Sequence, residues 1–204
     1  MSNQTSDNNK RIAKNTMIYD KIINKLKDIL GKFAYNIKNI LLNGIASSVF
    51  TPPILQRWIY KSLGYAIHKT SRIYPQCFCG AGKGKLKVGA NSYINYRVFL
   101  DLGNDIVIGN NVSIAFNCTF INSTHEIGDD NQRAGLGVAK KIIVEDGCWI
   151  GAHTTILPGV RIAKGCVIGA NSLITKDTEK NGLYVGAPAI RIKTLSVLKK
   201  DLVI

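Results

Sequence analysis

Aliphatic residues recur at every sixth position through the carboxyl-terminal half of the chain. From Val144 onward the sequence reads VEDGCW, IGAHTT, ILPGVR, IAKGCV, IGANSL and ITKDTE, so each segment opens on Val or Ile. A helix has a period of about 3.6 and a half-exposed strand a period of about 2, and neither explains this spacing. Short parallel strands joined by tight corners do explain it. The pattern predicts a β-solenoid in which three six-residue sides form one coil of roughly 18 residues.

The same period continues backward with less clarity, through Ile108, Ile114 and Phe120 and then, after a slip, through Val88 and Ile94. We therefore expect a mainly β fold over residues 73–192, with about six coils. Small residues accompany the aliphatic column, and Gly, Asn and Asp lie between the sides. These residues tolerate the left-handed backbone conformations that tight corners need.

The period lapses between residues 125 and 140, where the sequence is HEIGDDNQRAGLGVAK, and it resumes in the same phase at Val144. This polar, Gly-bearing stretch predicts a loop that is extruded from the solenoid. Loops of this length inside a compact repeat are more often functional than accidental. The loop begins at His125.

Before the solenoid the apolar spacing is helical. Ile22, Leu26, Ile29 and Phe33 fall on one side of a helix and several lysines on the other, so residues 17–72 are predicted to form a basic amphipathic helical segment. The sequence Thr-Pro-Pro at residues 51–53 divides this segment into two helices. Residues 1–16 are polar and are predicted to be a disordered tail, and residues 193–204 a C-terminal tail.

The excess of positive charge lies mainly in the amino-terminal part of the chain. The 204 residues carry a formal net charge of +14, and residues 1–72 hold 12 Lys or Arg against 3 acids. A basic amphipathic helix suits an anionic membrane surface. The alternative is that these helices pack on the end of the solenoid or on partner copies. No nucleic-acid recognition motif accompanies the charge, so we expect no nucleic-acid partner.

The cysteines and histidines indicate in which compartment the protein is located and whether it binds a metal. The five cysteines are an odd number and fall mostly in the repeat register, which indicates a reducing, cytoplasmic location. We see neither a secretory signal nor an apolar run of the ~20 residues that a membrane span needs. The three histidines, His68, His125 and His153, include no close pair, so no metal site is expected.

Three stretches carry a specific resemblance. NSTHEIG, then KKIIVEDGCWIGAHTTILPGVRIAKGCVIGANSLITKD, then VGAPAIRIK resemble the hexapeptide-repeat O-acetyltransferases. That group includes maltose, galactoside and nodulation-factor acetyltransferases and many capsule or lipopolysaccharide acetyltransferases. The resemblance covers residues 91–193 and implies a left-handed parallel β-helix. It also implies a homotrimer with active sites between subunits, which moves acetyl from acetyl-CoA to a sugar hydroxyl.

By this resemblance His125 matches the catalytic histidine. The chemistry agrees, because a sugar hydroxyl attacks a thioester slowly unless its proton is removed, and an imidazole with a pKa near ~6.5 suits that task at neutral pH. No Cys–His pair is recognisable in the sequence, so we expect direct attack on the thioester rather than a covalent acyl-enzyme.

The resemblance also implies binding residues. Asn95 and Asp101 match acceptor-binding positions, and Trp149 matches a tryptophan at the mouth of the active site, where its ring would stack on a sugar. The matching cofactor positions are Gly151, Ala152, Ala170, Thr175, Lys176 and Arg191. The small residues leave room for the pantetheine arm, and the two cations suit the phosphates of CoA. Small residues would also be found at the corners of a solenoid that binds no cofactor, so a cofactor-binding role and a purely structural role both stay open for them.

The expected function is that of an acetyl-CoA-dependent O-acetyltransferase acting on a precursor of a surface polysaccharide, located in the cytoplasm or peripherally at the inner face of the membrane. One alternative is an N-acetyltransferase for an amino sugar, a serine-like acceptor or an antibiotic. Another is a non-enzymatic β-helix scaffold, because a solenoid fold does not by itself imply catalysis.

Overall fold

The structure is a computed structural model that describes the backbone of residues 2–195 and the side chains of residue 17 and residues 19–195. The chain divides into two compact units, residues 1–38 and residues 39–204, which are described separately. The predicted C-terminal tail comprises residues 193–204, and its residues 196–204 lie outside the described residues.

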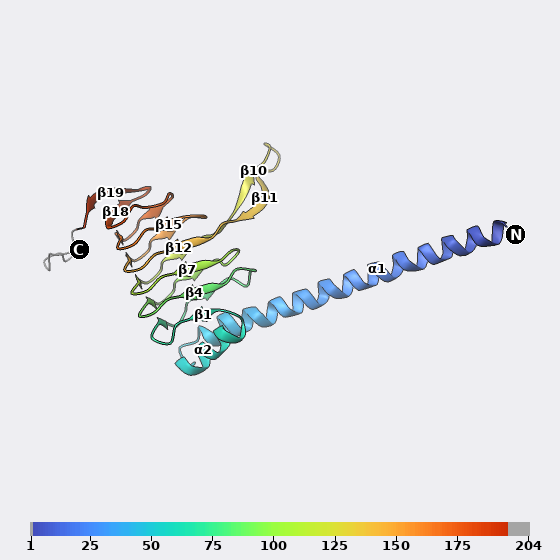
Figure 1. Cartoon of the computed structure of the whole chain (residues 1–204), viewed down its shortest axis with the longest axis horizontal. Helices are drawn as coiled ribbons and strands as arrows, with labels where there is room; N and C mark the ends of the chain where they lie inside the picture. The colour runs from blue at the N-terminus through green and yellow to red at the C-terminus, as the bar shows by residue number, and fades with distance from the viewer. Residues whose placement is uncertain (1, 196–204) are drawn as a thin grey trace. The chain divides into compact units, whose positions relative to one another are not determined.

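The second unit is a solenoid with three flat sides, each a parallel sheet, stacked coil upon coil (Figure 1). The first sheet contains β1 (Ala66–Ile67), β4 (Leu86–Val88), β7 (Ile106–Ile108), β12 (Ile142–Val144) and β15 (Arg161–Ile162). The second sheet contains β2 (Arg72–Ile73), β5 (Tyr93–Ile94), β8 (Ser113–Ile114), β13 (Trp149–Ile150), β16 (Val167–Ile168), β18 (Gly182–Gly186) and β19 (Ala189–Thr194). The third sheet contains β3 (Phe78–Cys79), β6 (Phe99–Leu100), β9 (Thr119–Phe120), β14 (Thr155–Ile156) and β17 (Leu173–Ile174).

Five coils have all three sides, and β18 begins a sixth on the second sheet before β19 turns back antiparallel to it. The predicted solenoid of about six coils is therefore confirmed. We call the turn from the second to the third sheet the second corner, and the turn from the third sheet to the first sheet of the next coil the third corner.

The six-residue period corresponds to columns of buried side chains. Ile94, Ile114 and Ile150 are fully buried and face one another across successive strands of the second sheet. Burying apolar surface contributes roughly 25 cal/mol per Å². Because each column continues through the stack, the period in the sequence is the spacing of the core itself.

The corners explain the polar residues between the aliphatic ones. Between residues 2 and 195, nine residues other than glycine have a positive φ, and five of them are asparagines, the residue type that best tolerates this conformation after glycine. These nine are Gln76, Asn91, Arg97, Leu102, Asn111, Asn117, His153, Asn171 and Asn181.

The solenoid begins earlier than residue 73, the predicted start. β1 pairs in parallel with β4 through Ala66 and Ile67, which adds one side to the first coil. β1 has only two residues and follows a helix, so it is too short to show a period of six. The boundary predicted from the pattern is wrong by one side of a coil.

Two short helices cover the amino-terminal end of the solenoid, the π-helix η1 (Ile40–Ala46) and α2 (Pro53–Ser62). Leu42, Ile59 and Tyr60 are buried in the same core as the coils. Asn43 completes the contact, because its side chain accepts a hydrogen bond from the backbone N–H of Cys79 (2.8 Å) and donates one to the carbonyl of Cys79 (2.9 Å). These bonds satisfy the open edge of β3, as a further strand would. For this part of the helical segment, packing on the solenoid end is what the structure shows.

The first unit is one helix, α1 (Ser2–Asn39), which includes one residue of the second unit. It runs through residues 2–16, where a disordered tail was predicted. Extending a formed helix adds one hydrogen bond for each residue that is fixed, so a polar sequence without an apolar stripe can continue a helix that begins elsewhere.

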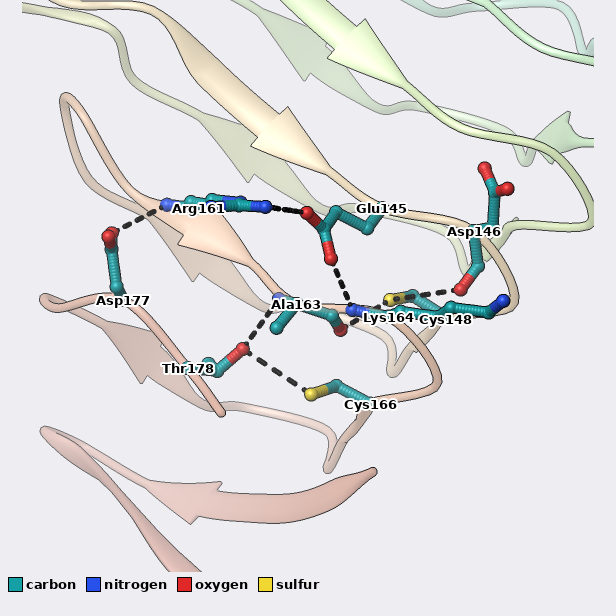
Figure 2. A network of polar contacts seen from close by, with 9 residues as sticks. All are labelled: Glu145, Asp146, Cys148, Arg161, Ala163, Lys164, Cys166, Asp177 and Thr178. Carbon is teal, nitrogen blue, oxygen red and sulfur yellow. Dashed lines mark hydrogen bonds and ion pairs between the residues drawn. The ribbon is translucent and has the colours of Figure 1, made fainter. Parts of the chain in front are cut away.

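Side chains close the far end of the first sheet, which has no sixth strand. Asp177 Oδ1 accepts a hydrogen bond from the backbone N–H of Arg161 (2.8 Å), and Thr178 Oγ1 accepts one from Ala163 (2.8 Å). The backbone N–H of Thr178 donates to the carbonyl of Arg161 (3.0 Å). Figure 2 shows these residues together with Glu145, which accepts from the guanidinium of Arg161. This hydrogen bond lowers the pKa of the Glu145 carboxyl group.

Candidate active site

The extruded segment is a β-hairpin formed by β10 (Ser123–Ile127) and β11 (Ala134–Ala139), which leaves the solenoid at the third corner (Figure 1). We call it the His125 hairpin. His125 lies on β10, is exposed, and pairs in register with Gly137 on β11. A Cβ atom at position 137 would lie 3.9 Å from the imidazole, so the glycine leaves one side of the ring open.

The base of the His125 hairpin is held by polar groups of the preceding coil. Asp101 Oδ2 accepts hydrogen bonds from the backbone N–H groups of Asn122 (3.2 Å) and Ser123 (2.7 Å). On the other strand, Asn104 Nδ2 donates to the carbonyl of Ala139 (3.0 Å). Gly103 lies against this base, because a Cβ atom there would fall 2.0 Å from Ser123 Oγ and would force that side chain to move. These contacts fix the direction in which the hairpin carries His125 away from the solenoid.

Several predicted binding residues lie at the second corner, on a different edge of the solenoid. Asn95 follows β5, Gly151 and Ala152 follow β13, and Ala170 lies just beyond β16. Asn95 Oδ1 accepts a hydrogen bond from the backbone N–H of Tyr96 (2.9 Å), as in a turn. A Cβ atom on Gly151 would lie 2.6 Å from the backbone nitrogen of Ala170, so stacking of the coils alone requires this glycine.

The remaining predicted residues are more dispersed. Trp149 lies on the outer side of the second sheet and is 44% exposed. Thr175 and Lys176 follow β17 at the third corner, and both are exposed. Arg191 on β19 forms an ion pair with Glu179 and donates to a backbone carbonyl, so this cation has partners within the chain.

The third corner thus holds Asp101, His125, Thr175 and Lys176, and the second corner holds Asn95, Gly151, Ala152 and Ala170. The structure brings together the members of each group along one edge and leaves the two groups on separate edges of the same chain. Acceptor and cofactor positions are thus divided between the two edges, and only the third corner also holds His125, so one chain by itself does not bring the full predicted set together.

The cysteines have the properties of core residues. All five are buried, and none forms a disulfide bond. Burial raises the pKa of the Cys77 and Cys118 thiols to about 11 and that of Cys148 to about 12. A thiol must ionise to act as a nucleophile, so these three are protonated at neutral pH. Among residues whose side chains are described, no three His, Cys, Asp or Glu gather in a way that suits a metal ion.

Sequence reasoning missed three features of this site. It assigned no function to Gly103 or Gly137, and it gave Asp101 no part in holding the His125 hairpin. For Gly137 a signal was available, the two glycines of AGLG in the extruded segment. Their partners were not visible, because the hairpin leaves the repeat and its cross-strand register has no period to follow.

Comparison with known proteins gives consistent matches. Residues 141–176 match the family described as bacterial transferase hexapeptide (six repeats). The chain is 33% identical over 151 residues to a galactoside O-acetyltransferase of Lactococcus lactis, with 74% of this chain and 73% of that relative covered. A hexapeptide-repeat acetyltransferase from Vibrio cholerae, solved in complex with acetyl coenzyme A, has a TM-score of 0.72 at 27% identity, over 80% of this chain and 88% of that chain. A maltose O-acetyltransferase from Clostridium difficile gives 0.70 at 28% identity, over 80% and 85%.

Proposed function

We propose, from the premise that this chain belongs to the hexapeptide-repeat acetyltransferase family, that it transfers acetyl from acetyl-CoA to a hydroxyl group of a saccharide. Membership confirms the resemblance inferred from the motifs, and with it an acetyl-CoA-dependent acetyltransferase of the galactoside and maltose type. The observation that carries the proposal on this chain is His125, exposed on a hairpin whose base is held by Asp101.

In the proposed reaction His125 is the general base. The acceptor hydroxyl gives its proton to the imidazole while its oxygen attacks the acetyl carbonyl carbon of the thioester. The tetrahedral intermediate collapses, the carbon–sulfur bond breaks, and the imidazolium returns the proton to the departing CoA sulfur. A positioned base of this kind contributes typically about 10²–10⁴-fold to the rate. The raised pKa values of the buried thiols support direct transfer without an acyl-enzyme.

The complete site is proposed to form between subunits of a homotrimer. The support is the separation of the predicted residues onto two corners of one chain. In a ring of three, the third corner of one copy faces the second corner of its neighbour. The His125 hairpin also exposes large apolar side chains, Ile127 and Leu136, which suit contact with a neighbouring copy.

The acceptor is proposed to be a precursor of a surface polysaccharide, acetylated at a membrane. Support comes from α1, where Ile22, Leu26, Ile29 and Phe33 form an exposed apolar stripe. Lysines lie on both sides of this stripe and would meet anionic head groups. No helix among the described residues is long and apolar enough to cross a membrane. We therefore propose attachment to the membrane surface through α1.

The catalytic proposal is tested by His125→Ala. We expect kcat for CoA release, measured with galactosides, maltose and sugar nucleotides as acceptors, to fall by about 10²–10⁴-fold. Thr124→Ala is the matched control, because alternate residues of a strand point to opposite faces. That variant should keep wild-type kcat and the same melting temperature.

Full acetyl transfer by His125→Ala would contradict the assignment of His125 as the general base. Identification of the product separates the acceptor classes, because O-acetyl esters are cleaved by mild alkali and N-acetyl amides are not. A product that resists mild alkali would favour the N-acetyltransferase alternative.

A further inference from the structure

A cavity of about 380 Å³ lies where α2 meets the first coil, at the opposite end of the solenoid from β18 and β19. Ile67, Ile73 and Tyr60 supply its apolar wall. All of its lining residues belong to the second unit, and none of them is among the predicted catalytic, acceptor or cofactor residues. The cavity is therefore separate from the proposed acetyl-transfer site.

The charge of the lining is entirely positive. Arg57, Lys69 and Arg72 line the cavity, and no Asp or Glu does. Arg57 donates one hydrogen bond, to the carbonyl of Lys69 (3.0 Å), which leaves the other N–H groups of its guanidinium for a ligand. None of the three forms an ion pair among the described side chains. Cations that gather without acids favour an anion, and a guanidinium matches the oxygens of a phosphate with paired donors.

The first turn of α2 adds to this field. Thr51, Pro53 and Gln56 line the cavity at the amino-terminal end of the helix, and no side chain caps that end. The positive end of the helix dipole lies at this first turn, which favours an anion. On another side of the cavity lies Tyr74, whose ring is tilted against Tyr96 with centroids 5.0 Å apart. A rigid aromatic wall beside cations suits a ligand that joins a phosphate to a planar or apolar group.

We propose that this cavity binds the diphosphate group of a ligand, with Arg57, Lys69 and Arg72 as its anion-binding residues. The diphosphate belongs either to a nucleotide or to a lipid head group, and the shared chemistry is the pair of phosphates. Binding here goes beyond the acetyl transfer proposed above and does not depend on it.

The test measures binding of inorganic pyrophosphate to the full chain by isothermal titration calorimetry. Arg72→Gln and Lys69→Gln each remove one charge from the cavity and should weaken binding about tenfold, since a charge-assisted hydrogen bond is stronger than a neutral one. Lys87→Gln is the matched control. Lys87 is an exposed lysine on β4 that does not line the cavity, so its loss should change the affinity less than about twofold.

Two further arms identify the source of the diphosphate. Displacement of pyrophosphate by UDP, with the same loss in Arg72→Gln, indicates a nucleotide. Weaker binding of Arg72→Gln than of wild type to vesicles that contain a polyprenyl diphosphate indicates a lipid head group. Arg72→Gln should bind CoA, titrated in the same calorimeter, with wild-type affinity, which separates the cavity from the cofactor site.

Three results would overturn the proposal: no pyrophosphate binding by the wild type, wild-type affinity for pyrophosphate in both charge variants, or an equal loss of affinity for CoA in Arg72→Gln. Because the measurement is of binding alone, an inactive preparation does not affect it. Failure of acetyl transfer is thereby distinguished from failure of this site.

Discussion

Asp101 accepts hydrogen bonds from Asn122 and Ser123, the two residues at which the chain leaves the solenoid to form the His125 hairpin. A carboxylate that accepts two backbone N–H groups fixes the local direction of the chain. Both bonds go to Oδ2, so this contact is compatible with the role in acceptor binding that the resemblance implies. That role stays a prediction, and the structure adds a positioning contact to it.

At the residue scale, the buried thiols make the free energy of unfolding depend on pH under alkaline conditions. The pKa is raised to about 11 for Cys77 and Cys118 and to about 12 for Cys148, from an ordinary value of 9.0. Above about pH 9 the unfolded chain loses thiol protons that the folded chain retains, so the free energy of unfolding falls as the pH rises. We expect a loss approaching about 1.4 kcal/mol per thiol for each pH unit between about pH 9 and pH 11. Urea unfolding at a series of pH values measures this slope.

Replacing Cys148 by Ala should make the alkaline loss shallower, because one of the three thiols no longer titrates in the unfolded state. An equally steep loss in this variant would mean that other groups cause it. Below pH 8 these thiols are protonated in both states, so they should contribute no slope there.

At the scale of elements, Asp177 and Thr178 replace a missing strand at the end of the first sheet (Figure 2). An exposed edge of a parallel sheet offers unpaired N–H groups to another chain, and side-chain acceptors remove that opportunity. Asn43 has the same function at β3, at the other end of the solenoid. Polar side chains thus close both ends of a stack that the repeat alone leaves open.

Thr178→Val tests this closure. Valine keeps the shape of the side chain but leaves the N–H of Ala163 without its acceptor, and Thr178 is 8% exposed. We expect the free energy of unfolding to fall by about 1–3 kcal/mol. Thr194→Val, at an exposed position of β19, is the control and should fall within about 0.5 kcal/mol of wild type in the same urea titration. Equal stability of the two variants would show that the edge does not need this bond.

The helix α1 has an apolar stripe with no partner among the described side chains of its own unit. Leu26→Asp with Phe33→Asp introduces two charges into this stripe and should lower sedimentation with anionic vesicles by about tenfold, since buried apolar area drives interfacial binding. Asn24→Asp with Tyr35→Asp makes the same charge change on the opposite face of the helix, so it should retain most of the binding. Equal losses in the two variants would indicate that charge alone attracts the protein and would contradict insertion of the stripe.

At the scale of the whole molecule, the proposed site depends on a second copy. Mixing His125→Ala with Ala170→Phe, two variants expected to be inactive as homotrimers, tests this directly. If the second corner of one copy meets the His125 hairpin of another, a site in an equimolar mixed trimer is intact about one quarter of the time. Reassembly after mild denaturation should therefore restore about that share of wild-type activity in the CoA-release assay. Mixed trimers without activity would place the complete site within one chain.

The period of six was enough to establish the solenoid, its register and its buried columns, because every coil repeats the same contacts and each aliphatic residue meets its equivalents above and below. The lapse in that period also located the extruded segment and His125. The resemblance to the family followed from motifs in the repeats, in the extruded segment and after the last complete coil, and comparison with known proteins confirmed it.

Features outside the repeat required the folded structure. The first side of the first coil, the pairing of His125 with Gly137 and the carboxylate of Asp101 at the hairpin base each join residues whose spacing follows no period. The cavity of Arg57, Lys69 and Arg72 forms only when α2 packs on the first coil. A sequence pattern records contacts that recur, whereas a contact made once depends on where the whole chain carries its two partners.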